Sequence, residues 1–500
     1  MSSKKIACST LWQIASQITM AALSVLSVKF VAIGLSRDLA GAYNSAYGYL
    51  QLFAILADFG LYAVSVQEVS RAPEQSSISG EPTRSQVLGA LIVLRSTIAL
   101  LSLGAALAIA WIVPVWAAGP LRIGITIAAF VPFFTLLAGV LRTVFQVQYK
   151  MHLVFIAEVT QRILTTALLA VIIFLGVRLS DDVRVYEYFL AVGAGGAMVL
   201  FLLSYFFAAS LTRIRPCFDR VLLLSLLRKA MPYGLAFLCI AFYRQFDLTM
   251  IALLREDFPS QNAAYGFASR IAEMTYLVPT FLLNSTLPVL ADRHDKGLST
   301  SSMLGKTLFS ILLFGTVSAL FSILWATPIM RLLTTPAYLA TPQIPGADTA
   351  LALLGIPMFL NGIVLYSFYA LLTKHAWKVL VSRMMVAVVL SLGLNLWRIP
   401  ISGFVGAIET SIVTHLFLVA TLLPAALRAL PVRFHSSYVW RWLLSSVVVA
   451  ILLRASAPLL TSIFSTALGL LIASLLLILL AMLFGFHRMF SLEAAEDAGR

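Results

Sequence analysis

Fourteen long runs of apolar residues divide the chain, and each is long enough to cross a lipid bilayer. A spanning helix needs about 20 mostly apolar residues. Only 11% of the 500 residues are charged, whereas a soluble domain has roughly 25%. The sequence therefore predicts an all-α polytopic membrane protein. The predicted spans are 9–35, 39–64, 85–112, 122–145, 153–176, 186–210, 230–254, 263–290, 305–327, 346–373, 378–398, 402–427, 440–456 and 460–484.

The distribution of basic residues predicts the orientation of these spans. Of the 35 lysine and arginine residues, 21 fall in the loops and tails on one side, 8 in the loops on the other side and 6 within the spans. Cytoplasmic loops are enriched in Lys and Arg. We therefore expect both termini to lie in the cytoplasm. The net charge of +14 follows from this distribution and does not indicate a nucleic-acid partner.

Two weak repeats relate the halves of the chain. AYNSAYGYLQLF from Ala42 resembles AYGFASRIAEMT from Ala264, and FQVQYKMHLVFIAEV from Phe145 resembles LLTKHAWKVLVSRMM from Leu371. Each pair has the same place relative to the membrane, so the repeat is of the parallel kind. It predicts two six-helix lobes, 1–215 and 216–430, followed by two further helices and a cytoplasmic tail in 431–500. The segment 219–229, with basic ends around apolar residues, predicts a separate helix at the inner membrane surface.

Six basic residues interrupt the predicted spans, and charges at that depth are costly. An Arg or Lys near the centre of a spanning helix costs about 2.5–3.5 kcal/mol on insertion, so such residues mark functional sites by default. Arg95, Arg162 and Arg244 are expected near the middle of the membrane, whereas Arg142 and Lys29 lie nearer the ends of their spans. The sixth residue is Arg270. Together these bases favour an anionic ligand, and the predicted ligand set is Arg95, Arg162, Arg244, Arg270 and Lys29.

Acidic residues in the same spans offer an alternative, purely structural interpretation. Glu158 and Arg162 are four residues apart, while the pairs Arg244 with Asp247 and Arg270 with Glu273 are three apart, so each pair shares a helix face and is able to neutralise itself. Arg95 has no acid on its own helix, Glu409 has no base near it in sequence, and Lys29 and Asp58 are expected to lie too far apart to pair. The candidate ion-coupling residues are Asp247, Glu273, Glu409 and Asp58.

Several kinds of chemistry have no support in the sequence. The three cysteines are scattered, the histidines show no metal-ligand spacing, and neither a hydrolase motif nor a phosphate-binding loop of the form GxxxxGK[ST] is present. We therefore expect no metal, no cofactor and no ATP hydrolysis. A gradient of Na⁺ or H⁺ is the expected source of energy for any transport.

Several segments resemble the Wzx-type flippases of polysaccharide repeat units, which belong to the multidrug/oligosaccharidyl-lipid/polysaccharide (MOP) exporter superfamily. They are AFYRQFDLTMIALL from Ala241, AAYGFASRIAEMTYLVPTFLLNSTLPVLADR from Ala263, GAYNSAYGYLQLFAILADFGLYAVSVQEVSR from Gly41, VFQVQYKMHLVFIAEVTQRIL from Val144 and GFVGAIETSIV from Gly403. Arg244 and Asp247 match the RxxD-like signature of this family, and Arg270 and Glu273 match its next segment. The chain departs from the usual YRIDTLML-like pattern at Gln245, Phe246 and Thr249.

The resemblance implies a V-shaped pair of six-helix bundles, as in MATE transporters, with a basic cavity between inward and outward openings. The implied cargo is a polyprenyl-diphosphate-linked oligosaccharide, moved across a bacterial inner membrane during the synthesis of a surface polysaccharide such as O-antigen or exopolysaccharide. A polysaccharide polymerase and chain-length proteins are the expected partners, besides the lipid bilayer. Three alternatives stay open: an ion-coupled drug exporter, a lipid II flippase of the same superfamily, and a membrane-embedded polysaccharide polymerase. The polymerase alternative is disfavoured by the absence of a long external loop.

Overall fold

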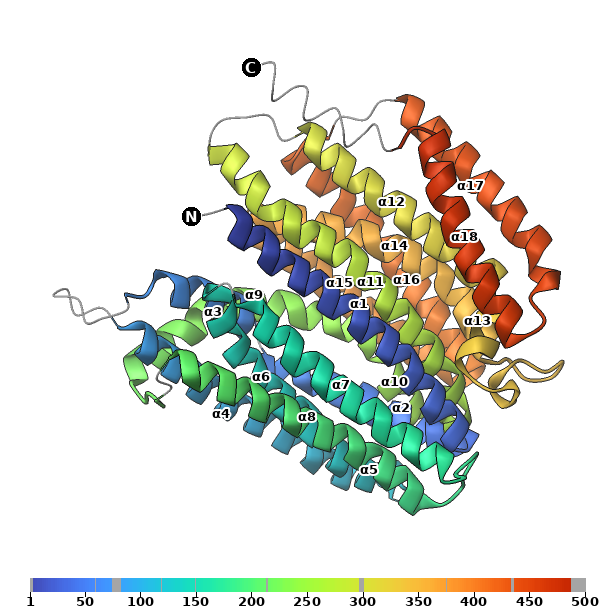
Figure 1. The fold of residues 1–500 in the computed structure, drawn as a ribbon, viewed down its shortest axis with the longest axis horizontal. Coiled ribbons are helices and arrows are strands. Elements are labelled where there is room, and N and C mark those ends of the chain that lie inside the picture. Colours follow the sequence, from blue (N-terminus) through green and yellow to red (C-terminus); the bar gives the residue numbers. More distant parts are fainter. Residues whose placement is uncertain are drawn as a thin grey trace. The chain divides into compact units, whose positions relative to one another are not determined.

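Every regular element that the structure describes is a helix, as the sequence predicts (Figure 1). The structure, a computed structural model, describes residues 3–486 except 59, 74–81, 118, 149, 213–214, 296–300, 375 and 433–435. The predicted cytoplasmic tail beyond residue 486 lies outside the described residues. Besides the helices, Leu35 and Ser180 form an isolated bridge, which ties the end of α1 (Ser3–Gly34) to the loop after α7 (Met151–Phe174).

The chain divides into two compact units, Met1–Ala263 and Ala264–Arg500. The six-helix lobes predicted from the repeat, 1–215 and 216–430, stay a prediction. Besides α1 and α7, the first unit contains α2 (Arg37–Asp58), α3 (Leu61–Arg71), α4 (Arg84–Ile112), η1 (Pro114–Trp116), α5 (Leu121–Ala128), α6 (Phe130–Val147), α8 (Val183–Leu211), α9 (Arg220–Gln245), α10 (Asp247–Leu254) and the first residues of α11 (Phe258–Asp295). The second contains the rest of α11, then α12 (Ser301–Leu324), α13 (Ala326–Leu333), η2 (Pro336–Tyr338), α14 (Ala347–Thr373), α15 (Trp377–Ser402), α16 (Phe404–Ala429), α17 (Ser436–Ser456), η3 (Ala457–Leu459) and α18 (Ile463–Leu483).

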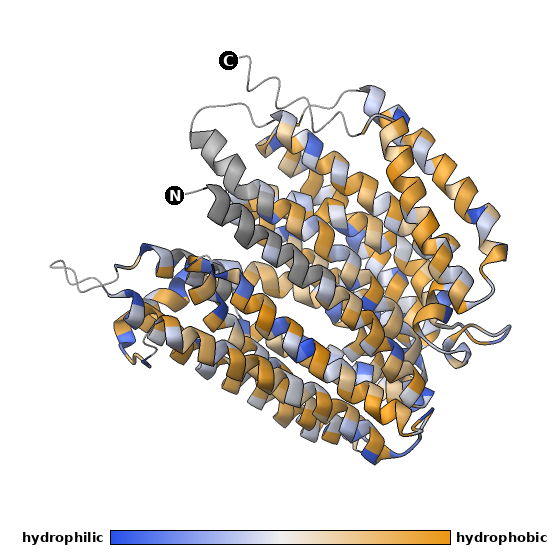
Figure 2. Cartoon of the chain, in the orientation of Figure 1, coloured by the Kyte–Doolittle hydropathy of each residue, from blue (hydrophilic) through white to orange (hydrophobic). Residues whose placement is uncertain are grey.

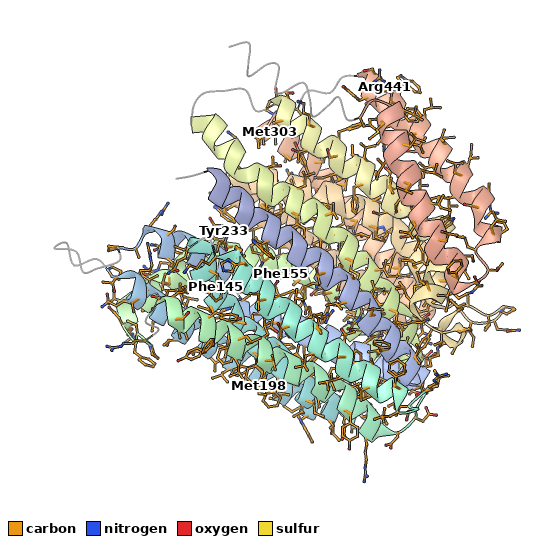
Figure 3. The ribbon with its side chains drawn as sticks, viewed as in Figure 1. Phe145, Phe155, Met198, Tyr233, Met303 and Arg441 are labelled. Carbon is orange, nitrogen blue, oxygen red and sulfur yellow. The ribbon has the colours of Figure 1, made fainter. Side chains whose placement is uncertain are left out.

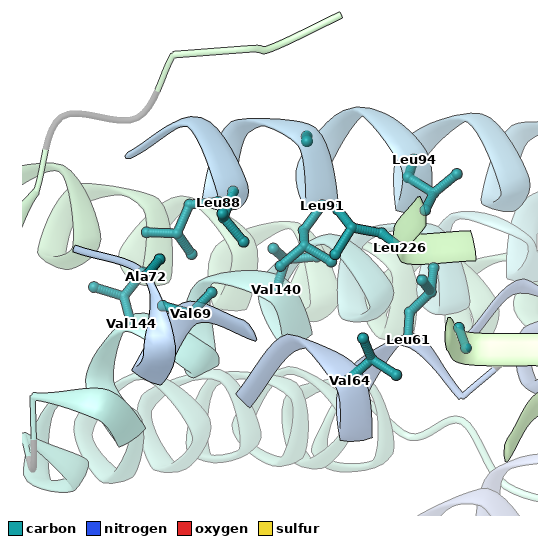
Figure 4. Close-up of a cluster of buried hydrophobic side chains, with 13 residues drawn as sticks. Leu61, Val64, Val69, Ala72, Leu88, Leu91, Leu94, Val140, Val144 and Leu226 are labelled. Atoms are coloured by element: carbon teal, nitrogen blue, oxygen red, sulfur yellow. The ribbon is translucent and has the colours of Figure 1, made fainter. Parts of the chain in front are cut away.

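Helix α6 is central to the packing of the first unit, where it contacts α3, α4 and α8. A buried cluster joins α3, α4, α6 and α9 through small and branched side chains, among them Leu61, Leu91, Val140 and Leu226 (Figure 4). Phe145, nearer the end of α6, belongs to a second buried cluster with residues of α7 and α8 (Figure 3). A third, small cluster of Ala57, Ala99 and Leu136 adds α2 to α4 and α6. Burial of this apolar surface holds α2, α4, α6 and α9 together.

Helix α14 occupies the centre of the second unit, packed between α12 and α16. Helix α17 packs on α12 and α18 on α13. Two indole N–H groups bind across these contacts: Trp325 Nε1 donates to the carbonyl oxygen of Leu453 at 2.9 Å, and Trp442 Nε1 donates to Thr316 Oγ1 at 3.1 Å. Helix α17 is therefore held by hydrogen bonds as well as by packing.

Eleven helices of the described residues are long and apolar enough to cross a membrane. Hydrophobic residues run along most of the length of α4, α8, α17 and α18 (Figure 2). The other three predicted spans coincide with α1, α2 and α11, which are helical but are not among the eleven. The protein is thus a multi-pass membrane protein, and the count of fourteen spans stays a prediction.

Two predicted spans are broken helices. The span 122–145 consists of α5 and α6, with a break at Ala129, three residues before Pro132, whose ring is tolerated in the first turn of a helix. The span 230–254 consists of α9 and α10, with a bend at Phe246.

The prediction of a separate surface helix at 219–229 is wrong. Asp219 caps α9 by accepting from the amide of Val221 at 2.8 Å, and the helix then continues without a break through Pro232 to Gln245.

Gly60, at the turn from α2 into α3, is a position where only glycine fits. Its φ of +69° is in the left-handed region, and an added Cβ would lie 2.7 Å from the amide nitrogen of Gly234 on α9. The left-handed backbone alone costs other residues about 1–2 kcal/mol. We expect Gly60→Ala to lower the melting temperature of the purified protein clearly, whereas Gly104→Ala, where nothing lies within 4 Å of the added Cβ, should not lower it. Equal melting temperatures for the two variants would contradict this assignment.

Candidate functional site

A cavity of about 450 Å³ opens among α2, α6 and α9 of the first unit. Its wall is mostly apolar, with a few polar groups that converge on it, which is the usual composition of a ligand site. The residues of the wall are Tyr47, Leu50, Gln51, Ala54, Ile55 and Asp58 of α2, Gly60 of the turn that follows it, Val131, Pro132, Thr135 and Leu136 of α6, and Phe237, Ile240, Ala241, Arg244 and Gln245 of α9.

The spacing of these residues follows from helical geometry. On α2, Tyr47, Gln51 and Asp58 are separated by four and seven residues, so they share one face of the helix. On α9, Phe237 and Arg244 are likewise seven residues apart. One stripe of each helix therefore faces the cavity, and each stripe carries a charged residue at its end.

Asp58 and Arg95 form an ion pair at the wall of the cavity. Arg95, on α4, donates from Nη2 to Asp58 Oδ1. The Arg95 side chain is only 6% exposed, whereas that of Asp58 is 32% exposed. Arg95 thus lies behind the carboxylate, which itself faces the cavity. Sequence reasoning placed Arg95 among residues without an acid on its own helix, and the acid comes from the neighbouring helix.

The guanidinium of Arg95 occupies space that a glycine leaves open. A Cβ added at Gly139 of α6 would lie 3.2 Å from both Nη1 and Nη2 of Arg95. Nε and Nη1 of Arg95 are buried, with no hydrogen-bond partner among the residues that the structure describes. The Asp58 carboxylate is therefore the main compensation for this buried charge.

Arg244 lies at the end of α9, immediately before the bend at Phe246, and lines the cavity. Asp247 is the first residue of α10 and is buried, at 3% exposure. An acidic side chain in the first turn of a helix interacts favourably with the positive end of the helix dipole. Arg244 thus lines the cavity from the end of α9, and Asp247 begins the next helix.

A buried amide network holds α10 and the start of α11 against α2. Asn44 Nδ2 donates to the carbonyl oxygen of Asn262 at 3.2 Å, and Asn262 Nδ2 donates to Ser45 Oγ at 2.8 Å and to the carbonyl oxygen of Leu248 at 2.9 Å. Side-chain amides thus satisfy backbone groups beside the break in the helix. The network anchors α10, immediately after the bend, to α2 and α11.

The other bases predicted for the first unit lie away from this wall. Arg162, on α7, donates to Ser24 of α1. Lys29 is a partly buried residue of α1, a helix that packs along α7. Arg142 forms an ion pair, in which its Nη1 donates to Glu158 Oε1 at 2.8 Å. None of these bases is among the residues that line the cavity of the first unit.

The remaining predicted residues belong to the second unit. Arg270 is partly buried and Glu273 exposed, one turn apart on α11. Glu409, expected to have no base near it, instead accepts at Oε2 from Nε of Arg398 at 2.8 Å, and the Arg398 guanidinium also lies over the Trp397 ring. Arg398 and Glu409 lie on different helices, α15 and α16, and the short connection between these helices brings them together.

Sequence reasoning missed the uncharged polar residues of the cavity. Gln51, Gln245, Tyr47 and Thr135 line it, and Gly139 supports it from behind. Glutamine and threonine are common enough in spanning helices that their presence does not mark a binding site. Only the helix face that they share with Asp58 or Arg244 could have indicated that they line the cavity. The spacing Tyr47, Gln51, Asp58 was visible in the sequence and is the one signal that was available.

The sequence matches a known protein family. Residues 6–294 match the model of a family described as polysaccharide biosynthesis protein. The chain belongs to this family. No protein with a curated description matches the sequence.

Solved structures with the same fold belong to the MOP superfamily. The lipid II flippase MurJ in an inward closed conformation has a TM-score of 0.68 at 15% identity, with 97% of this chain and 99% of that chain covered. An inward-facing multidrug resistance MATE family transporter of the MOP superfamily has a TM-score of 0.58 at 14% identity, covering 83% of this chain and 98% of its own. The MATE multidrug transporter DinF-BH has a TM-score of 0.58 at 15% identity, covering 87% and 98%. The fold of this family member is therefore that of MOP transporters.

Proposed function

We propose that the protein is a flippase that moves a polyprenyl-diphosphate-linked oligosaccharide across the bacterial cytoplasmic membrane by alternating access. The observation that carries the proposal is the position of Arg244 in an otherwise largely apolar cavity of a polysaccharide biosynthesis family member. A guanidinium binds phosphate oxygens through charge-assisted, often bidentate hydrogen bonds. Such bonds offset the cost of holding a charge within the membrane, because the diphosphate supplies the opposite charge.

The proposed energy source is a gradient of Na⁺ or H⁺, or the membrane potential. Broken spanning helices are common at the binding sites of transporters, where the free helix ends contact substrate and coupling ions. The bend at Phe246 is such a break. Asp247, at the start of the second half-helix, is the first candidate for ion coupling, and Glu273 and Glu409 are the others. Asp58, the fourth candidate from the sequence, is less suited because it is paired with Arg95.

Depletion of the protein in its host tests this function. We expect lipid-linked oligosaccharide repeat units to accumulate on the cytoplasmic leaflet, where externally added enzymes and lectins do not reach them. Loss of a polymerase would leave single units on the outer leaflet instead. Accumulation on the outer leaflet, or no accumulation, would contradict the flippase.

Lipid II is a second candidate cargo. The similarity to the lipid II flippase MurJ covers 97% of the chain, whereas the two MATE structures cover 83% and 87%. If lipid II is the cargo, expression of the protein should restore growth to cells depleted of their own lipid II flippase. Failure to restore growth, together with accumulation of oligosaccharide units on depletion, favours the first candidate.

A further inference from the structure

The polar groups of the cavity are of two chemical kinds. Arg244 is a donor that carries a positive charge and suits phosphate oxygens. Asp58 and Gln51, together on one face of α2, offer carboxylate and amide groups instead. A carboxylate repels a diphosphate, so the binding of an anion does not by itself explain why Asp58 lines the cavity.

The pairing with Arg95 changes what Asp58 is able to bind. Because Arg95 neutralises it, the carboxylate adds no net negative charge to the cavity wall and gives little attraction for a free cation. Arg95 donates to only one oxygen, and 32% of the Asp58 side chain remains exposed. What faces the cavity is therefore a fixed, strong hydrogen-bond acceptor, which suits O–H donors.

Gln51 completes this chemistry, since an amide both donates and accepts. Its side chain is exposed and lies on the same wall, seven residues and two helical turns before Asp58. A sugar ring presents neighbouring hydroxyl groups, each a donor and an acceptor. At 1.5 Å per residue the two positions lie about 10 Å apart along α2, so they suit hydroxyls at separate points of a sugar moiety, the carboxylate as an acceptor and the amide as donor and acceptor. The aromatic ring of Tyr47, one turn further along, adds an apolar surface.

We infer that Asp58 and Gln51 bind sugar hydroxyls of the cargo beside the diphosphate site of Arg244, and that Arg95 is a positioning residue for Asp58. This inference rests on the proposed function and deepens it. Gly139 takes part indirectly, because the absence of its side chain leaves room for the Arg95 guanidinium. The cavity then distinguishes a glycosylated carrier lipid from the bare carrier diphosphate.

Binding measurements with two probes test the inference. The purified protein in lipid nanodiscs is titrated with undecaprenyl diphosphate, which has no sugar, and with undecaprenyl-diphosphate-linked N-acetylglucosamine. We expect the wild type to bind the glycosylated probe about ten-fold more tightly, as one or two net hydrogen bonds provide. Gln51→Leu should lower the ratio of the two affinities, chiefly by weakening the binding of the glycosylated probe, and should leave the part of the preference that Asp58 provides.

Three further variants separate positioning from stability. Asp58→Asn combined with Arg95→Met leaves no charge buried alone, and Gly139→Val displaces the guanidinium without removing a polar group; both should reduce the ratio. Arg244→Gln should weaken both probes equally. Asp257→Asn is the matched control, because Asp257 also accepts from an arginine, Arg255 at 2.7 Å, but in the loop between α10 and α11. It should leave both affinities unchanged.

The outcomes distinguish this inference from the proposed function. If the wild type binds both probes equally, or if the Gln51 and Asp58 variants weaken both probes alike, the sugar site is wrong although diphosphate binding stands. If the wild type binds neither probe, the proposed cargo itself is wrong. A ratio that falls in the cavity variants but stays constant in Asp257→Asn supports the inference.

Discussion

Replacement of Arg244 by glutamate is expected to abolish export of the polysaccharide while the protein remains folded and inserted. The substitution places a negative charge in the cavity where two phosphate groups are proposed to bind. Arg244→Gln should reduce transport by about 100-fold or more, since a charge-assisted hydrogen bond contributes about 1.5–3 kcal/mol and a guanidinium makes two. Arg244→Lys should keep part of the activity as a point charge without the bidentate geometry. Surface polymer in a complemented deletion strain, normalised to membrane protein level, measures the effect.

A matched control exists in the same unit. Arg255 is the first residue after α10 and binds Asp257 through two nitrogens, at 2.7 and 2.9 Å. Arg255→Gln removes the same group from a solvent-exposed ion pair, where such pairs contribute little, and should leave export nearly normal.

Charge reversal at Arg95 should also abolish export, because it places a second carboxylate beside that of Asp58. Normal export in both Arg244→Glu and Arg95→Glu would contradict the cavity model.

Charges within apolar runs are easy to find in a sequence, and this is why Arg95, Arg244 and Asp58 could be selected before the structure. Their pairing could not be predicted. Arg95 and Asp58 are 37 residues apart, on α4 and α2, and whether two such residues meet depends on the rotation of each helix about its axis. Hydropathy gives the depth of a residue but not that rotation, so the pair was missed.

The break at Phe246 illustrates a second limit. The segment AFYRQFDLTMIALL contains neither proline nor glycine, the residues that usually interrupt a helix. The tertiary contacts beside it cannot be seen in the sequence: Asn262 donates to the carbonyl oxygen of Leu248, on α10, and to Ser45 of α2. By contrast, the break between α5 and α6 lies three residues before Pro132, a residue that often interrupts a helix. The sequence therefore contains a local signal near one break and none at the other.

The ion pair of Arg95 and Asp58 predicts an asymmetric loss of stability. Removing one partner of a buried pair costs about 3–5 kcal/mol, since the other charge stays buried without compensation. Asp58→Asn leaves Arg95 in this state, with Nε and Nη1 already lacking a partner among the described residues. Arg95→Met leaves Asp58, which is accessible to water from the cavity. We therefore expect Asp58→Asn to destabilise the protein much more than Arg95→Met does.

Thermal denaturation of the four members of the cycle, purified in one detergent, measures this asymmetry. The double variant Asp58→Asn with Arg95→Met should recover most of the stability lost in Asp58→Asn, because it leaves no buried charge and an uncharged pair of similar volume is often neutral for stability. Asp257→Asn, which breaks an exposed pair, should cost no more than about 1 kcal/mol. A double variant as unstable as Asp58→Asn would mean that the carboxylate has a structural role beyond compensating Arg95. A larger loss in Arg95→Met than in Asp58→Asn would mean that Asp58, rather than Arg95, is the charge shielded from water, and would overturn the assignment of the carboxylate to the cavity wall.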